Sequence, residues 1–203
     1  PGVETRPIKL IAGASPFCET YFNDAEAEKT DLLGKRNDGW SVVKRLLQHE
    51  RASQTGARPT SNKTAQPLQE AAKDYCGTDQ DGSLADKDLR SRIVDHLMHT
   101  KAHGLTISRI SAEAKGNPEV SAAASILKNS ATRVSQDRAE LLLEIMGHQG
   151  IGWEGDAFSE DELENVRGWL SGKAISIYGG SYEIQNNIIA KNILGLPETT
   201  QKG

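Results

Sequence analysis

The sequence has few cysteines, no long apolar run and no excess of positive charge. Two cysteines in 203 residues, Cys18 and Cys76, are too few for a disulfide framework, and their spacing is not that of metal ligands. No apolar run approaches the roughly 20 residues that a membrane-spanning helix needs. The net charge of −4 gives no electrostatic reason to expect nucleic acid. We therefore expect a protein of a reducing compartment, without a membrane span or a nucleic-acid partner.

What is present is a helix-rich pattern behind a short extended segment. Residues 1–30 contain β-prone runs and turn residues, which predict extended structure. Apolar residues then recur at helical spacing, and clusters of Gly, Asn and Pro separate the segments. We expect helices at about residues 39–56, 65–75, 84–114 and 120–145, from 159 onward, and around 184–193.

The helix expected at residues 120–145 has the most regular apolar stripe. Its apolar positions follow one another at steps of 4, 3, 4 and 3 from Val120 to Val134, and Leu141 and Ile145 continue the stripe. A narrow, alanine-rich stripe favours close antiparallel packing in an up-and-down bundle. A second stripe, at steps of four, runs through Leu89, Ile93 and Leu97.

The most distinctive string lies near the C-terminus. Residues 177–185 read Ile-Tyr-Gly-Gly-Ser-Tyr-Glu-Ile-Gln, and Leu-Gly-Leu-Pro follows at 194–197. Two adjacent glycines let a ligand approach the backbone, and the start of the next helix offers free N–H groups. Segments 1–24, 32–40 and 144–150 precede this string, and the order of all four segments is that found in one known family. Across these segments the chain resembles the acyl-CoA dehydrogenase family.

The resemblance implies the fold and its boundaries. It places the end of the family's middle β-domain and a linker in residues 1–35, and the C-terminal helical domain in residues 36–203. The expected fold is therefore mainly α, an up-and-down helical bundle preceded by a short β remnant. We expect the chain to be part of a longer protein and to be inactive alone.

The resemblance also implies an activity. The family removes two hydrogens from the α and β carbons of an acyl-CoA thioester, giving the 2-enoyl-CoA, with FAD as cofactor. The implied partners are acyl-CoA, an electron-transfer flavoprotein as acceptor, and further subunits in a homo- or hetero-oligomer, a dimer or a tetramer. The implied setting is lipid and fatty-acid catabolism in the cytoplasm of a bacterium, with the mitochondrial matrix as the other option. The alternative is a non-catalytic structural subunit of a hetero-oligomeric acyl-CoA dehydrogenase.

The catalytic base that the resemblance implies is Glu50. In one branch of the family the base directly follows the tyrosine of the C-terminal string, but this chain has Gly179 there, which cannot accept a proton. In another branch the base belongs to a Glu-Arg pair on the first helix of the C-terminal domain, which matches Glu50 and Arg51. Arg51 would then contact the substrate or position the helix. The alternative is that Glu50 is a solvated carboxylate, as most charged residues are.

The resemblance assigns the remaining site residues to two glycine turns. On the substrate side they are Tyr178 and Gly179. On the flavin side they are Gly147, His148, Gly180, Ser181 and Glu183.

Each of these residues also has a purely structural alternative. Ser181 has the side chain of a helix N-cap, and Glu183 that of a first-turn acid favoured by the helix dipole. The turn at 147–150 has the composition of a helix C-cap. Tyr178 can be a core residue without any ligand.

One motif of the family is missing. Many members carry Arg-x-x-Phe-Gly after the first helix, and its arginine contacts the flavin pyrophosphate of a neighbouring subunit. Residues 58–82 contain no such string, so Arg58 or Lys63 would have to replace it. This departure and the glycine at 179 favour the alternative of a structural subunit. Three histidines share a helical face without a carboxylate or cysteine to complete a ligand set, so we expect no metal site. They are His96, His99 and His103.

Overall fold

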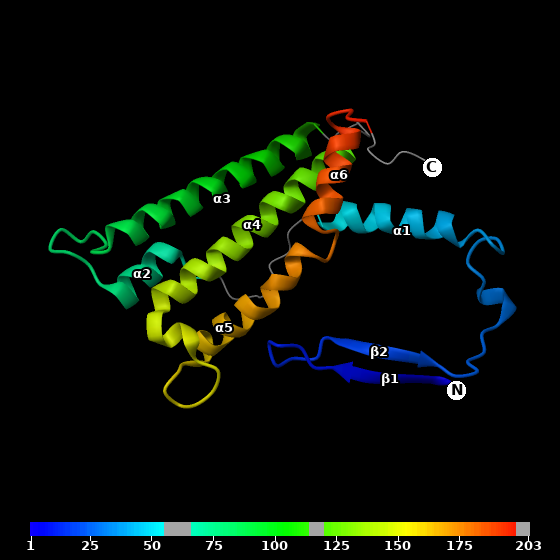
Figure 1. The fold of residues 1–203 in the computed structure, drawn as a ribbon, viewed down its shortest axis with the longest axis horizontal. Helices are drawn as coiled ribbons and strands as arrows, with labels where there is room; N and C mark the ends of the chain where they lie inside the picture. Colours follow the sequence, from blue (N-terminus) through cyan, green and yellow to red (C-terminus); the bar gives the residue numbers. More distant parts are fainter. Residues whose placement is uncertain (55–65, 114–119, 198–203) are drawn as a thin grey trace. The chain divides into compact units, whose positions relative to one another are not determined.

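The chain divides into two compact units, Pro1–Ser53 and Gln54–Gly203, and each is described by itself. Among the described residues, no helix has both the length and the apolar character that crossing a bilayer requires. The computed structural model (Figure 1) describes residues 1–54, 66–113 and 120–197, with the helical backbone alone at 48–54 and 120–122.

The first unit contains a β-hairpin and one helix. Strands β1 (Val3–Ile8) and β2 (Phe17–Phe22) pair antiparallel, with Val3 opposite Phe22 and Ile8 opposite Phe17. A short 3-10 helix, η1 (Lys29–Asp31), precedes α1 (Gly39–Gln54). The extended structure predicted for residues 1–30 and the helix predicted from residue 39 are confirmed.

The second unit is a bundle of helices, as predicted from the apolar spacing. Its elements are α2 (Leu68–Cys76), α3 (Lys87–Glu113), α4 (Val120–Met146), η2 (Gly147–Ile151), α5 (Glu160–Gly172), η3 (Lys173–Ser176) and α6 (Tyr182–Asn192). The predicted mainly α fold is confirmed. Helix α3 begins slightly later than predicted because Asp86 stands at its N-terminus, where the carboxylate accepts from the N–H of Leu89 at 2.9 Å.

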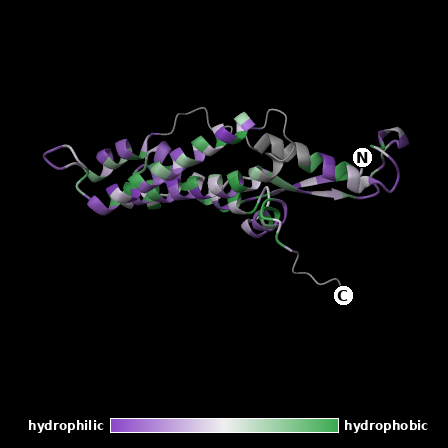
Figure 2. Ribbon diagram, turned by 90° about the horizontal axis from the view of Figure 1, so that it is seen from above, coloured by the Kyte–Doolittle hydropathy of each residue, from purple (hydrophilic) through white to green (hydrophobic). Residues whose placement is uncertain are grey.

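Helix α4 is the centre of the second unit. It contacts α2, α3, α5 and α6, and Figure 1 shows α3 running alongside it, with α2 and α6 near its two ends. Leu127, Leu141 and Ile145 are buried, so the predicted stripe does face the neighbouring helices. Figure 2 shows the apolar positions alternating with hydrophilic ones along these helices, as expected for amphipathic elements.

The largest buried cluster lies where α2 and α3 meet the C-terminal half of α4. Burying each large aliphatic side chain contributes about 1.5–3 kcal/mol to the free energy of unfolding. This cluster therefore holds α2 and α3 against α4. Its members are Leu68, Ala71, Ala72, Leu84, Leu89, Ile93, Leu141, Leu142, Ile145 and Met146.

The stripe predicted on α3 is wrong at Leu97. Its side chain is 42% exposed, whereas that of His96 is 6% exposed and takes the buried place. At 3.6 residues per turn, each step of four advances the stripe by about 40°, which carries Leu97 out of the buried face. Burial lowers the pKa of His96, whose Nε2 lies 3.3 Å from the hydroxyl of Thr100. The core therefore contains a neutral imidazole.

A hydrogen bond joins α2 to the start of α5. The Tyr75 hydroxyl donates to Oε1 of Glu162 at 2.8 Å. Glu162 also completes a capping box with Ser159, in which the Ser159 N–H donates to the carboxylate at 2.7 Å and the Ser159 hydroxyl accepts from the Glu162 N–H at 3.3 Å. The Ser159 N–H first, and then Tyr75, lower the pKa of Glu162. The helix predicted from residue 159 onward is confirmed, and its first turn is acidic.

Tyr75→Phe is expected to lower the free energy of unfolding by about 1 kcal/mol, because the Glu162 carboxylate loses a donor. Burial and the bond to Glu162 raise the pKa of Tyr75 from 10.0 to about 12. This stabilisation is therefore complete below the unfolded-state pKa and is lost as the pH rises through the folded-state value. Urea unfolding from neutral pH up to about pH 12 checks both statements. Tyr21→Phe, whose hydroxyl bonds to Glu19 on the exposed hairpin, is the control, and equal effects in the two variants would contradict the prediction.

Candidate functional site

The chain makes a tight turn between η3 and α6. Gly179 and Gly180 both have positive φ, 71° and 101°, a region that favours glycine because a Cβ would meet the backbone. Tyr178 is 57% exposed, and Gly179 is exposed as well. The turn therefore offers its backbone to an approaching group without side chains in the way.

A side chain of α6 fills the inner side of this turn. Gln185 is 5% exposed, and its Nε2 donates to the carbonyl oxygen of Gly179 at 2.7 Å. A Cβ at Gly180 would overlap this amide nitrogen. Position 180 thus favours glycine for its φ, and a Cβ there would require the amide of Gln185 to shift.

Donors on α4 hold the chain before the turn. Lys128 Nζ donates to the carbonyl oxygen of Ile175 at 2.9 Å, and the Thr132 hydroxyl donates to the same oxygen at 3.4 Å. One helical turn further, Gln136 Nε2 donates to the carbonyl oxygen of Gly172 at 3.2 Å. Carbonyl groups at the end of a helix lack partners within it. These donors, four residues apart on one face of α4, supply the partners and fix where the turn begins.

The start of α6 presents two polar side chains. Ser181 occupies the N-cap position, but its side chain makes no capping hydrogen bond to the backbone. The Ser181 hydroxyl first, and then the N–H of Glu183, lower the pKa of Glu183. Glu183 is therefore an ionised, weakly basic acceptor that suits a ligand hydroxyl or amino group.

The second glycine turn follows α4 directly. The helix ends at Met146, Gly147 has a φ of 55°, and η2 begins there. This is the backbone of a C-cap glycine, so the structural alternative describes the turn correctly. His148 is exposed, with its ring centroid 6.4 Å from that of Phe158. The turn thus offers an imidazole beside open backbone.

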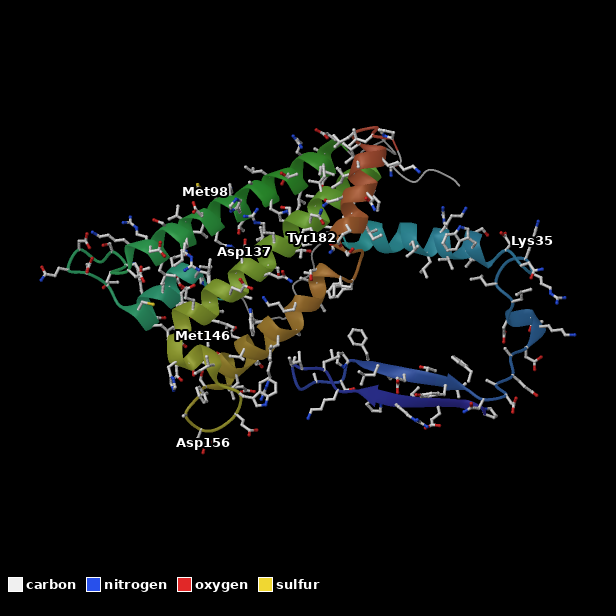
Figure 3. The ribbon with its side chains drawn as sticks, viewed as in Figure 1. Lys35, Met98, Asp137, Met146, Asp156 and Tyr182 are labelled. Atoms are coloured by element: carbon white, nitrogen blue, oxygen red, sulfur yellow. The ribbon has the colours of Figure 1, made fainter. Side chains whose placement is uncertain are left out.

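The two glycine turns lie beside different parts of α4. Tyr182, the first residue of α6, donates to the carbonyl oxygen of Asn129 at 3.4 Å, whereas Met146 is the last residue of α4 (Figure 3). At about 1.5 Å per residue, Asn129 and Gly147 are about 27 Å apart along the helix axis. The structure therefore does not bring the predicted flavin residues at 147–148 together with those at 180–183.

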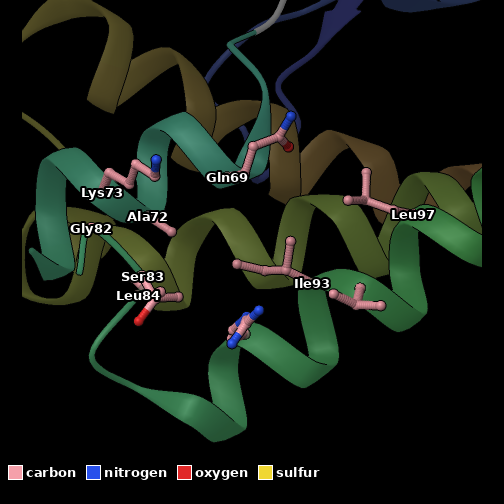
Figure 4. A pocket seen from close by; sticks show the side chains of 10 residues that line it. Gln69, Ala72, Lys73, Gly82, Ser83, Leu84, Ile93 and Leu97 are labelled. Atoms are coloured by element: carbon pink, nitrogen blue, oxygen red, sulfur yellow. The ribbon is translucent and has the colours of Figure 1, made fainter. Parts of the chain in front are cut away.

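Two grooves lie elsewhere on the second unit. One, of about 220 Å³, lies between α2, the loop after it and α3, where Ala72, Leu84 and Ile93 line it (Figure 4). The other, of about 390 Å³, lies between α3 and α4 and reaches Tyr182. Neither of these grooves is lined by a predicted site residue. Among the described residues, the predicted site residues at 178–183 lie on an exposed turn and line neither of these two grooves.

Comparison with known proteins decides the family. Residues 37–194 match the family model described as "Acyl-CoA dehydrogenase, C-terminal domain". The chain belongs to the acyl-CoA dehydrogenase family. Acyl-CoA dehydrogenase IpdE1 of Mycolicibacterium smegmatis is 33% identical over 199 residues, which cover 97% of this chain and 47% of that protein.

Solved structures agree on the fold. The ChsE4-ChsE5 complex from Mycobacterium tuberculosis matches with a TM-score of 0.73 and 19% identity, covering 98% of this chain and 51% of the matched chain. The Tcur3481-Tcur3483 steroid ACAD matches with a TM-score of 0.72 and 22% identity, covering 98% and 50%. The chain thus spans about half the length of these matched proteins.

The predicted catalytic base, Glu50, lies on α1. The helix at Glu50 and Arg51 is confirmed, but both side chains fall outside the described residues, so their roles stay predictions. Arg58 and Lys63, the suggested replacements for the missing arginine, also lie outside them. Among the residues that the structure describes, no group of three or more His, Cys, Asp and Glu is placed to hold a metal ion.

The turn at residues 178–183 carries two side chains, Ser181 and Glu183, of the types that bond to the hydroxyl and amino groups of a nucleotide. Its glycine backbone is unobstructed, and a Cβ at Gly180 would close the space that the turn and Gln185 share. Ser181 and Glu183 add polar groups at the start of α6. The negative charge of Glu183 repels phosphate, so cations from another segment would have to bind the pyrophosphate.

Sequence reasoning missed Gln185 and the donors of α4. Gln185 precedes Ile188 and Ile189 by three and four residues, so a polar residue stands on an apolar face of α6. This polar residue on an apolar face was the signal in the sequence that could have pointed to Gln185. For Thr132 no signal existed, because its partner carbonyl, that of Ile175, is 43 residues away.

Proposed function

We propose that the full-length protein is an FAD-dependent acyl-CoA dehydrogenase that converts an acyl-CoA thioester to the 2-enoyl-CoA. The observation that carries the proposal is the open turn at Gly179 and Gly180, in a chain that matches the family's C-terminal domain. Tyr178 and Gly179 contact the acyl thioester on the exposed side of the turn. Because the chain covers about half of its relatives, other parts of the full-length protein complete the pocket.

The proton chemistry belongs to Glu50 in this proposal. Gly179 has no side chain that could take a proton. The pKa of Glu183 is lowered, so Glu183 is a weak base. Glu50 takes the α-proton as the general base. Arg51, next to it, contacts the substrate. The electron pair of the broken α C–H bond forms the double bond while the β-hydrogen leaves as hydride. Bound FAD supplies the acceptor for that hydride.

The separation of the two turns supports an oligomer. A distance of about 27 Å along α4 is too long for the ring system of one flavin to touch both turns of one copy. In the proposed assembly, Gly180, Ser181 and Glu183 contact the flavin of their own subunit. Gly147 and His148 contact the flavin of a neighbouring subunit.

The test uses the full-length protein. Purified protein is expected to contain FAD and to lose its visible absorbance when an acyl-CoA is added without oxygen. The series of thioesters should include CoA esters of steroid side chains, because one structural neighbour is a steroid ACAD. An electron-transfer flavoprotein is the acceptor to use for turnover. If no thioester bleaches the bound flavin, the catalytic proposal is overturned. If the protein is purified without flavin, the proposal that FAD is its cofactor is overturned as well.

Gly179 favours a second candidate, a non-catalytic structural subunit of a hetero-oligomeric acyl-CoA dehydrogenase. Two structural neighbours are complexes of two named chains, ChsE4-ChsE5 and Tcur3481-Tcur3483. This candidate predicts that Glu50→Gln leaves the turnover of the purified complex unchanged. The catalytic candidate predicts that the same variant abolishes it.

A further inference from the structure

We propose that Gln185 is a positioning residue, which holds the peptide unit between Gly179 and Gly180 so that its N–H faces the ligand. The inference rests on the proposed function, in which this turn faces the acyl thioester and the flavin. Gln185 itself touches neither of them, because its side chain lies on the buried side of the turn.

The geometry of one peptide unit carries the argument. In a planar trans peptide, the C=O of one residue and the N–H of the next point in opposite directions. The Gly179 carbonyl points at the buried Nε2 of Gln185, 2.7 Å away. The N–H of Gly180 therefore points away from the interior, and it has no hydrogen-bond partner among the described residues. It is available as a donor on the exposed side of the turn.

Burial keeps the amide of Gln185 on this carbonyl. A buried amide without a hydrogen-bond partner is costly, so the side chain has no competing position of similar free energy. The backbone N–H of Gln185 donates to the carbonyl oxygen of Ser181 at 2.9 Å, which anchors the residue in the first turn of α6. Turn and helix start thus form one rigid piece.

Gly180 provides the room that the contact needs. Its φ of 101° directs the backbone past the amide, and a Cβ on it would overlap Nε2 of Gln185. The two positions are therefore matched to each other. A change at either one is expected to move the same peptide unit.

The experiment compares Gln185→Glu and Gln185→Met in the full-length holoenzyme. A protonated glutamic acid can still donate to the Gly179 carbonyl, whereas a carboxylate repels it and methionine offers no donor. Tyr75→Phe is the matched control, because it removes a hydrogen bond near the far end of α4 from this turn. The readouts are kcat/KM across pH, the melting temperature, and hydrogen exchange of the backbone amides of residues 178–182 without acyl-CoA.

We expect Gln185→Met to lower kcat/KM by about tenfold to a hundredfold at every pH, as a misplaced donor does. Gln185→Glu is expected to be close to wild type at low pH and to lose activity as its carboxyl group ionises. Exchange at the Tyr178 amide, whose N–H donates to the carbonyl oxygen of Ala174 at 3.1 Å, is expected to be faster in Gln185→Met and unchanged in Tyr75→Phe.

Two results would overturn the proposal. One is exchange and kcat/KM within about twofold of wild type in both variants. The other is that kcat/KM falls in proportion to the loss in melting temperature, and to the same extent in Gln185→Met and Tyr75→Phe. If the wild-type protein contains flavin and reacts with no thioester, the proposed function fails, while the exchange measurement still decides whether Gln185 holds the turn.

Discussion

Glu50→Gln in the full-length protein is expected to slow α-proton exchange of a bound acyl-CoA by about 10²–10⁴-fold, the usual contribution of a general base. Glutamine keeps the size of the side chain but cannot take up the proton. Flavin content should not change, because the predicted flavin residues lie on the two glycine turns of the second unit. Mass spectrometry of the loss of deuterium from the α carbon measures the exchange rate. The flavin absorbance measures the flavin content.

Two further variants make this result specific. Glu26→Gln removes an exposed carboxylate from the same unit and should leave exchange unchanged. Glu183→Gln removes the acceptor bonded to Ser181, so it should weaken flavin binding but keep exchange once flavin is saturating. If Glu183→Gln stopped the exchange and Glu50→Gln did not, the base would lie at the turn.

The fold could be predicted largely because its signals are local. The steps of 3 and 4 along α4 describe one face of a helix, and Leu127, Leu141 and Ile145 are buried on it. Helix α5 begins where the sequence predicts a helix from residue 159, and Ser159 and Glu162 form a capping box there. Leu97 shows the limit, since a stripe read in steps of four ignores the slow rotation of that stripe around the helix.

The site could be predicted only in part because its contacts are not local. The double glycine is visible as a string, but its shape depends on a side chain in the next helix and on donors from α4. Lys128 reaches a carbonyl 47 residues later in the chain. Nor does sequence order show that the turns at 147–148 and 180–183 lie beside different parts of one helix. That result depends on α6 packing against the start of α4, which tertiary contacts alone determine.

Gly180→Ala is expected to destabilise the protein by about 1–3 kcal/mol more than Gly155→Ala, because it adds steric overlap to backbone strain. The two glycines have nearly the same φ, 101° and 104°. A Cβ at Gly155 meets nothing within 4 Å, whereas one at Gly180 overlaps Nε2 of Gln185. Gly155→Ala should therefore show only the cost of the backbone conformation, about 1–2 kcal/mol. Urea unfolding of the two variants measures the difference.

The double variant Gly180→Ala/Gln185→Ala identifies the source of that difference. Removing the amide removes the overlap, so the double variant should be less destabilised than the sum of the two single variants, as expected for residues in contact. Additive effects would mean that the new methyl group meets something other than Gln185. A cost equal to that of Gly155→Ala would mean that the turn moves freely to accept the methyl group. In either case the turn would not be held by the amide, and the direction of the Gly180 N–H would lose its support.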